Sequence, residues 1–223
     1  MTSQPSTDRG RRTRRRIVDA ALEVVAERGA QGASLDEVGA RARTSKGQLY
    51  HYFNDRDDLL RSVAEATNEA VLGAQASLFA SLGTAGGMRA WADSLVALNE
   101  SRHGTGGCPI ASLVAQVGER DEAARSVLAS GFDRWEQAIE AGLAAQKQAG
   151  ELRPDADTGW LAANVLATLQ GGLVLAQARR DPGALRAALD GALRLVDSYR
   201  FTPTTASHSQ GRPPKMTDRR PGA

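Results

Sequence analysis

Apolar residues between positions 14 and 53 recur at helical spacing in three groups. The first group, between Ile17 and Val25, marks one face of a helix that should end at Gly29, since glycine readily adopts the left-handed conformation of a helix end. The apolar residues between Leu35 and Leu49 are spaced to bury one face of two further short helices against the first. The pattern therefore predicts a three-helix unit near the N-terminus.

Two helix-start signals lie eleven residues apart within this unit. Ser34 is followed three residues later by Glu37, and Ser45 is followed in the same way by Gln48. Each serine can cap a helix while the third residue reaches back to the cap. Only residues 42–44 remain for the turn between the two helices, so the sequence predicts a helix-turn-helix with its second helix held outward.

The outward positions of this second helix carry groups suited to reading DNA. Lys46 supplies a cation, Gln48 a bidentate amide, Tyr50 a hydroxyl and His51 an imidazole, while Gly47 has no side chain. Cations contact phosphates, and amides and cations also bond to base edges in the major groove. The pattern favours a DNA-binding protein.

The rest of the chain predicts six longer helices and no strand. Glycines at 83, 86 and 87 and the HGTGG segment at 103–107 indicate breaks, and proline is favoured at the first position of a helix. We expect helices over 55–80, over 88–101, from Pro109, over 121–149, from Asp155 or Asp157 to Arg180, and from Asp181 to about Arg200. The expected fold class is all-α.

The last two expected helices carry little polar surface in their middles. Between Trp160 and Ala178 the apolar residues go nearly all round the helix, and a helix that is apolar on every side must be covered on every side. A second copy of the chain, packed as an isologous four-helix interface, would supply that cover. Gly171, Gly172 and Ala176 would permit close helix approach, although a kinked core helix of a monomer fits the same pattern.

The length and composition of the chain are consistent with this interpretation but would not have been sufficient to predict it. A chain of 223 residues can form one small and one larger domain, and 4% aromatic content suits an all-helical protein. The net charge of +2 divides unevenly: +3 over residues 1–61, −4 over 62–200 and +3 over 201–223. A single cysteine and the lack of about 18 unbroken apolar residues favour a cytoplasmic chain that does not span a membrane.

The span from about Arg14 to Leu60 resembles the N-terminal domain of the tetracycline-repressor (TetR) family of transcriptional regulators. TSKGQLYHYFNDRDDLL is similar to the turn, the recognition helix and the next helix start of that family. Gln48 stands where the family often has threonine, and Arg56 where it often has lysine, which leaves the operator sequence open. The resemblance implies a dimer formed through the last two long helices, bound to an approximately palindromic operator.

The resemblance also implies which residues contact DNA. Family members extend an arm toward the minor groove or backbone, and this chain has six arginines between Arg9 and Arg16. The two serines can instead be caps alone, and Tyr52 can belong to the core. The candidate DNA-binding residues are Ser34, Thr44, Ser45, Lys46, Gly47, Gln48, Tyr50, His51, Tyr52 and Arg14.

Family members commonly enclose a small-molecule cavity in the body of the chain, and a ligand there moves the recognition helices out of register. The resemblance therefore implies a repressor whose operator affinity falls when a small, largely apolar effector binds. Helical phase suggests these candidate effector-binding residues: Trp91, Leu95, Asn99, Cys108, Phe132, Trp135, Asn164 and Thr168. Asn164 and Thr168 can be polar handles, or Thr168 can bond back to the Asn164 carbonyl.

Cys108 admits a second interpretation as a redox or electrophile sensor, because a helix start favours a thiolate. Against this, lone cysteines are usually small buried residues, and no second cysteine can resolve an oxidised form within the chain. The Gly-Cys-Pro segment also resembles a multidrug- and flavonoid-responsive subgroup of the family, known for small-molecule binding.

The sequence carries no pattern typical of an enzyme. The three histidines lie in separate segments without a triad-like order or metal-ligand spacing, so we expect no catalysis, no metal and no cofactor. An architectural DNA-binding protein without a ligand, or a repressor controlled by a protein partner, remains open. We expect a disordered basic arm over 1–13, a DNA-binding domain over 14–61, an effector-binding and dimerisation domain over 62–200, and a disordered tail over 201–223. The Gly-Arg-Pro of that tail resembles an AT-hook, but a basic disordered end explains it more simply.

Overall fold

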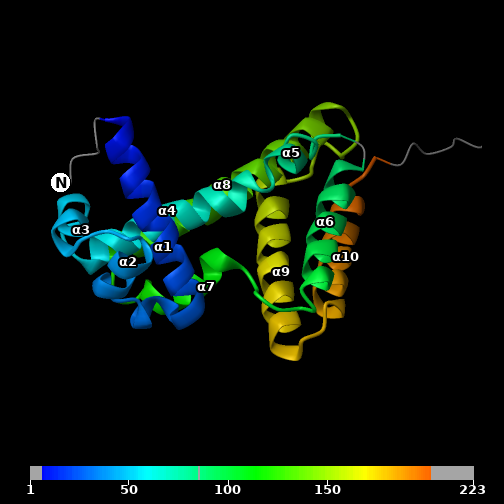
Figure 1. Ribbon diagram of the computed structural model, residues 1–223. Helices are drawn as coiled ribbons and strands as arrows, with labels where there is room; N and C mark the ends of the chain where they lie inside the picture. The colour runs from blue at the N-terminus through cyan, green and yellow to red at the C-terminus, as the bar shows by residue number, and fades with distance from the viewer. Residues whose placement is uncertain (1–6, 85, 202–223) are drawn as a thin grey trace, which may run out of the picture.

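A computed structural model describes residues 7–84 and 86–201, which form ten helices and no strand (Figure 1). The helices are α1 (Asp8–Gly32), α2 (Leu35–Arg41), α3 (Lys46–Tyr52), α4 (Arg56–Gly73), α5 (Ala76–Phe79), α6 (Gly87–Ser101), α7 (Pro109–Val117), α8 (Glu122–Gln148), α9 (Thr158–Arg179) and α10 (Gly183–Asp197). The expected all-α fold is confirmed, and α1–α3 lie at the opposite end of the molecule from α6, α9 and α10.

The N-terminal unit packs as its apolar spacing indicates. Ile17 and Val24 of α1, Val38 of α2 and Leu49 of α3 are buried together in one core. Phe53, the residue that ends α3, is fully buried as well. α2 therefore lies with its apolar face against α1, while α3 packs mainly against α2 and leaves its opposite face outward.

α1 begins earlier than the sequence suggests. The Thr7 side chain accepts a hydrogen bond from the Gly10 backbone N–H at 3.1 Å, and Asp8 lies in the first turn, where a carboxylate favours the positive end of the helix dipole. The expected disordered arm over 1–13 is therefore wrong for residues 8–13, which are helical. Residues 1–6 lie outside the described part of the chain, as do residues 202–223 of the expected tail.

Gly29 breaks α1 where the sequence predicts a helix end. Its φ of 73° and ψ of 164° are not helical, and the chain continues beyond it for one short turn to Gly32. A positive φ of this kind is readily adopted only by glycine. The kink turns the chain toward α2.

The helix expected over 55–80 is in fact two helices. α4 ends at Gly73, and the short α5 follows after Gln75. The Gln75 side chain accepts a hydrogen bond from Trp91 Nε1 at 2.9 Å and donates to the Val71 carbonyl at 3.0 Å. Gly73 is the local signal of this break, and the contact between Gln75 and Trp91 adds a tertiary one.

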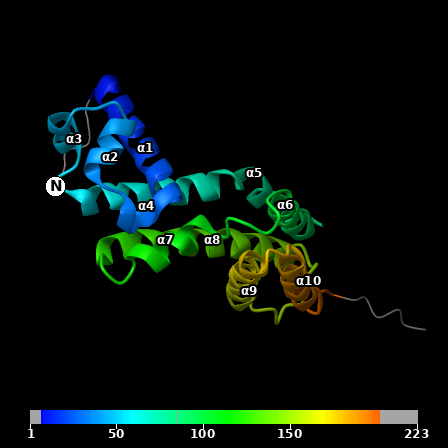
Figure 2. The same ribbon diagram turned by 60° about the horizontal axis from the view of Figure 1, so that its bottom comes forward.

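The body is built on two long packed pairs. α4 lies along α8, and α9 packs closely along α10 (Figures 1 and 2). Gly172 permits the second contact, since a Cβ there would lie 2.8 Å from the Ala188 Cβ of α10. Gly171 differs, because a Cβ there would meet nothing within 4 Å. Of the expected small-residue stripe, Gly172 and the buried Ala176 serve packing within the chain, and Gly171 faces outward.

The outward side of α9 is apolar. Trp160, Val174 and Leu175 are 49%, 58% and 45% exposed, and Ala167 and Ala178 are exposed on the same side as Gly171. By length and composition α9 is the one helix in the described part of the chain that could cross a membrane. Its other face is buried against the body through Leu161, Val165 and Leu169. α9 is thus a core helix with one uncovered apolar side.

Candidate nucleic-acid interface and ligand cavity

Both predicted serine caps are present. Ser34 Oγ accepts from the Glu37 backbone N–H, and Ser45 Oγ accepts from the Gln48 backbone N–H, each at 3.2 Å. The expected reverse contacts are wrong, because both third residues bond elsewhere: Glu37 forms an ion pair with Arg28 at 3.0 Å, and Gln48 Oε1 accepts from Thr44 Oγ1 at 2.7 Å. The Thr44–Gln48 bond orients the amide that faces outward from α3.

The outer face of α3 is open to solvent. Ser45, Lys46, Gln48, Tyr50 and His51 are all exposed. A Cβ on Gly47 would meet nothing within 4 Å, so the protein's own packing does not require a glycine there. A residue without a side chain allows a ligand backbone to approach the helix closely. The face therefore has the shape and the chemistry of a DNA-binding surface.

Two candidate residues on this surface already have partners. Lys46 Nζ lies 3.6 Å from a carboxylate oxygen of Asp36 on α2, with both side chains largely exposed. Such a surface pair is weak and can be exchanged for a phosphate contact. Tyr52 is half-buried, and its ring stands edge-on to that of His51 with the centroids 5.0 Å apart. It lies at the border between the core and the surface.

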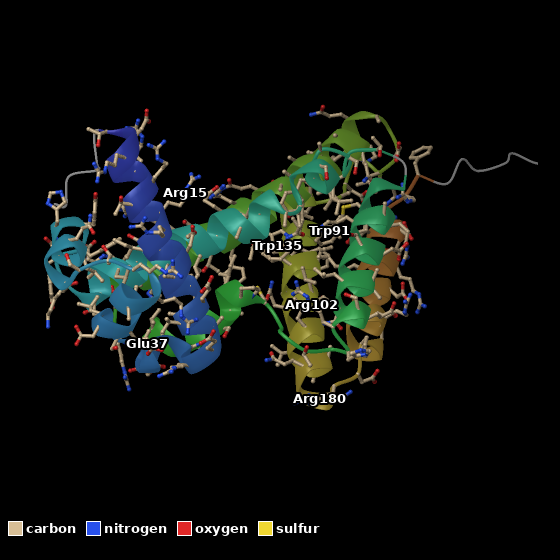
Figure 3. The ribbon with its side chains drawn as sticks, in the orientation of Figure 1. Arg15, Glu37, Trp91, Arg102, Trp135 and Arg180 are labelled. Atoms are coloured by element: carbon tan, nitrogen blue, oxygen red, sulfur yellow. The ribbon has the colours of Figure 1, made fainter. Side chains whose placement is uncertain are left out.

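The arginines of α1 divide into two groups. Arg14 is half-buried: it donates to Ser62 Oγ at 2.6 Å and lies over the Phe53 ring, so this candidate DNA contact already has partners within the protein. Arg16 donates to the Ala42 carbonyl at 3.0 Å. Arg9, Arg12 and Arg15 are exposed, and Figure 3 shows Arg15 on the open side of α1.

Arg43 is a surface cation that the sequence analysis did not single out. It is exposed and has a φ of 49° in the turn between α2 and α3. The signal in the sequence was its place in a helix-turn-helix turn, directly before Thr44. A cation at that point adds to the positive charge beside the recognition helix.

A cavity of about 380 Å³ lies in the body, between the DNA-binding unit and α9. α4 supplies one wall through Thr67, Ala70 and Val71, and α6 supplies another through Leu95 and Leu98. α1, α5, α8, α9 and the segment before α7 also contribute lining residues, and the cavity is open to solvent on one side. Its volume lies within the range of about 300–1,000 Å³ that is usual for small-molecule sites.

Four of the eight candidate effector-binding residues line this cavity: Leu95, Asn99, Cys108 and Trp135. Trp91 does not, because it is fully buried behind Gln75, which lines the cavity instead. Phe132, Asn164 and Thr168 do not line it either. The Asn164 side chain donates back to the Trp160 carbonyl at 2.8 Å, on the uncovered side of α9.

Helical phase did not predict which residues of α9 line the cavity, because that helix is apolar nearly all round. Its pattern does not show which side faces the cavity, and the residue that does so is Leu173. Arg102 and the glycine-rich segment, whose Thr105 and Gly107 line the cavity, were not predicted from the sequence. A charged residue at a helix end carries no sequence signal of a cavity.

Cys108 is buried, at 6% exposure, where α7 begins. Burial raises the pKa of the Cys108 thiol, and contacts with the backbone of Ala111 and Ile110 and with Gln170 offset that rise in part. The thiolate is therefore scarcer at neutral pH than in an ordinary cysteine, which disfavours the redox-sensor interpretation.

α7 connects the cavity to the DNA-binding unit. Its first residue, Pro109, lines the cavity, and Gln116 near its other end accepts a hydrogen bond from the Ala30 backbone N–H directly after the Gly29 kink. Gln31 donates to the Gln116 carbonyl at 3.1 Å and accepts from Arg120 Nη1 at 2.8 Å. A movement of α7 would therefore displace the segment in which α1 turns toward α2.

Two family models match the two parts of this architecture. The model described as "Bacterial regulatory proteins, tetR family" matches residues 17–63, and "Tetracyclin repressor-like, C-terminal domain" matches residues 86–192. The chain belongs to the TetR family. The first match covers the helix-turn-helix and the second covers most of the body, so this TetR-family protein is a DNA-binding transcriptional regulator and not an enzyme.

Relatives and solved structures agree. An uncharacterized HTH-type transcriptional regulator of Mycobacterium tuberculosis is 29% identical over 75% of this chain and 86% of its own length. Transcriptional regulator AcuR of Cereibacter sphaeroides is 28% identical over 76% and 78%. The crystal structure of Escherichia coli NemR in its reduced form has a TM-score of 0.71 at 20% identity, covering 86% of this chain and 99% of that one. A TetR-family regulator from Cytophaga hutchinsonii has a TM-score of 0.72 at 18% identity, over 89% and 100%.

Proposed function

We propose that this TetR-family protein is a homodimeric, sequence-specific repressor whose operator affinity falls when a small, largely apolar effector binds. The observation that carries the proposal is the cavity, because α4 forms one of its walls and only three residues separate α4 from the recognition helix α3. An occupant that displaces α4 would also displace α3.

The uncovered side of α9 supports the homodimer. Trp160, Val174 and Leu175 form an exposed apolar strip, and Gly191 of α10, like Gly171, has open space where a Cβ would stand. Glycine inside a helix is destabilising by about 0.5–1 kcal/mol relative to alanine, so an outward one at such a place indicates close contact with another helix. α9 and α10 of a second copy would cover this side by the same residues.

A dimer would give the DNA contacts their geometry. Two α3 helices should enter successive major-groove segments roughly 34–36 Å apart, so the operator should be an approximate inverted repeat. Lys46, Gly47 and Gln48 would lie near the bases, and Ser45, Tyr50 and His51 near phosphates. Ser34 and Thr44 join the phosphate set, while Tyr52 and Arg14 would act mainly by supporting α3 from within the protein.

Two contacts could transmit the signal. α4 forms a wall of the cavity, and α7 leads from its rim to the Gln116–Ala30 hydrogen bond. A coupling of about 1–3 kcal/mol would change operator affinity about 5–150-fold. The regions 14–61 and 62–200 would then act as reader and sensor, joined by α4, and a cytoplasmic location follows from binding chromosomal DNA.

Selection from pooled random-sequence duplexes tests the proposal. The purified protein should enrich an inverted repeat, and binding to it should weaken as salt rises because phosphate contacts release counterions. Salt-sensitive retention of every duplex without enrichment would favour the architectural alternative. The enriched duplex then serves as the probe for effectors that release it; an operator that no small molecule releases would favour a protein partner.

A further inference from the structure

Arg102 is the only charged residue among the described residues that line the cavity. It lies in the C-cap position of α6 and is exposed, at the edge of the cavity. Its Nη1 lies 3.9 Å from the point that a Cβ on Gly106 would occupy, so the guanidinium lies beside the glycine-rich segment. In the described part of the chain it has no ion-pair partner, and no carboxylate lines the cavity.

Two buried polar atoms in the cavity wall also have no partner in the part of the chain that the structure describes. Asn99 Oδ1 is an acceptor on a side chain 5% exposed, and Trp135 Nε1 is a donor on a side chain 2% exposed. Both residues line the cavity. Most buried polar side-chain atoms are hydrogen-bonded, so two unpartnered ones at a single cavity indicate a ligand that supplies their partners.

Trp135 and Arg102 lie in different parts of the site, whereas Asn99 lies on the last turn of α6, three residues before Arg102. Figure 3 places Trp135 where α4 and α8 approach α9, and Arg102 lower in the same view, between α9 and α6. The wall elsewhere is largely aliphatic, with residues such as Ala70, Val71 and Leu95. An occupant that satisfies both parts therefore needs an apolar body between two different polar ends.

From this arrangement, and resting on the proposed function, we propose that the effector is an amphipathic anion. A carboxylate would bind the Arg102 guanidinium at the edge, and an apolar body would fill the cavity. An oxygen function at the inner end would accept from Trp135 Nε1. Guanidinium–carboxylate bonds are stronger than neutral hydrogen bonds and can be bidentate, so the edge discriminates by charge.

The probes are decanoate, 1-decanol and decylammonium, which share an apolar body and differ in the charge of the head. Isothermal titration on the full-length protein, below the micellar concentrations, gives each dissociation constant. Decanoate should bind about five- to tenfold more tightly than decanol, and decylammonium the most weakly, since one partly exposed charged contact separates them. Equal binding of decanoate and decanol, the reverse order, or no binding by any probe would overturn the proposal.

Arg102→Gln should lower the affinity for decanoate to that for decanol and leave decanol binding unchanged. Arg102→Lys should keep part of the preference for the anion, because it keeps the charge. Arg125→Gln, which removes an exposed cation of α8 that does not line the cavity, should retain the full preference. Retention of the preference by Arg102→Gln would refute the role of Arg102.

The inner end is tested with ω-hydroxydecanoate. In the wild-type protein the added hydroxyl should preserve or improve affinity, whereas an added hydroxyl in a purely apolar site lowers it because the group loses its water without a partner. Trp135→Phe should remove that tolerance and leave binding of decanoate itself unchanged. A wild-type protein that rejects the hydroxyl would exclude a polar inner end.

Operator binding, measured on the same preparations without a probe, separates the two proposals. A protein that binds its operator but does not distinguish decanoate from decanol would refute the anionic effector and leave the proposed repressor intact. A protein that distinguishes the probes but binds no operator would refute the repressor alone.

Discussion

The reader and the sensor satisfy their polar groups in different ways. In α1–α3, arginine side chains bond to carbonyls at helix ends: Arg16 to Ala42, and Arg56 of α4 to Ala30 and Ala33. None of the buried side-chain polar atoms that lack a partner in the described residues belongs to these three helices. The body and α4 contain all of them, including two in the cavity wall. The reader therefore has its buried polar side-chain atoms paired, while the proposed sensor has polar atoms without a partner in the described part of the chain.

The largest expected effect is at the uncovered side of α9. Val174→Arg should yield a monomer, because it would bury an unpaired charge in the proposed interface at a cost of about 3–5 kcal/mol. Operator affinity should fall at least about a hundredfold, since a monomer offers one recognition helix where the inverted repeat requires two. Light scattering and operator binding measure both. Ala123→Arg, at an exposed position of α8, is the control; a dimeric Val174→Arg protein would contradict the proposed interface.

The second largest effect is expected from the arginine side chains that bond to backbone carbonyls in the reader. Arg56→Ala should lower the free energy of unfolding by about 2–3 kcal/mol, because the buried carbonyls of Ala30 and Ala33 lose charged donors. Urea denaturation measures this. Arg125→Ala, which removes an exposed arginine paired with Glu122, should leave stability unchanged. Equal loss in both variants would mean that the carbonyl contacts contribute nothing particular.

On the outer face of α3 the expected effect is on binding and not on stability. Lys46→Ala and Tyr50→Ala should each weaken operator binding by about 1–2 kcal/mol, roughly 5–30-fold, because each removes an exposed contact to DNA. The thermal midpoint should not change appreciably, since both side chains are largely outside the core. Arg125→Ala again controls for a lost cation. Normal binding by both variants would mean that the recognition helix has been misassigned.

In the sensor, replacement of Asn99 should change the free energy of unfolding in the opposite direction. Asn99→Leu should leave stability unchanged or raise it by up to about 1 kcal/mol, because it removes a buried acceptor that has no partner among the described residues and lines the cavity. Thermal unfolding without ligand measures this. A loss of more than about 1 kcal/mol would show that the amide is satisfied in the unliganded protein and would remove the contrast between the two regions.

The smallest expected signal is the reactivity of Cys108. Its pKa is raised by burial, so the thiolate forms at higher pH than in a free cysteine. Alkylation by iodoacetamide near neutral pH should therefore be much slower in the folded protein than in urea, and should accelerate only as the pH rises toward that pKa. The two rates, measured by mass spectrometry, decide the point. Equal rates would restore a thiol-based sensor as a serious alternative.

Sequence was most informative where structure depends on neighbours in the chain. The caps at Ser34 and Ser45 are local hydrogen bonds, and so are those at Asp121 and Asp157 that begin α8 and α9. The break between α4 and α5 was not predicted although α4 ends at Gly73, since one glycine is a weak signal and the contact between Gln75 and a tryptophan of α6 joins distant segments. Hydrogen bonds between neighbours in the chain could be predicted from the sequence, and contacts between distant segments could not.

The cavity shows the same limit. Leu95, Asn99 and Trp135 were identified because amphipathic helices indicate which side is inward, and Cys108 lies at the start of such a helix. Asn164 and Thr168 were misplaced because α9 lacks such a pattern, and its polar residues turn out not to line the cavity. Arg102 was overlooked because nothing in a single sequence tells a cation at the edge of a cavity from one on the surface.

Gly171 and Gly191 have a consequence for how the protein behaves on dilution. Two outward glycines in mid-helix weaken each isolated subunit, and contact with the second copy would offset that weakness. Folding and association are then linked by mass action, so the thermal midpoint should rise with protein concentration. A cell that makes little of this regulator would hold fewer molecules able to bind DNA, and also a less stable fold in each of them.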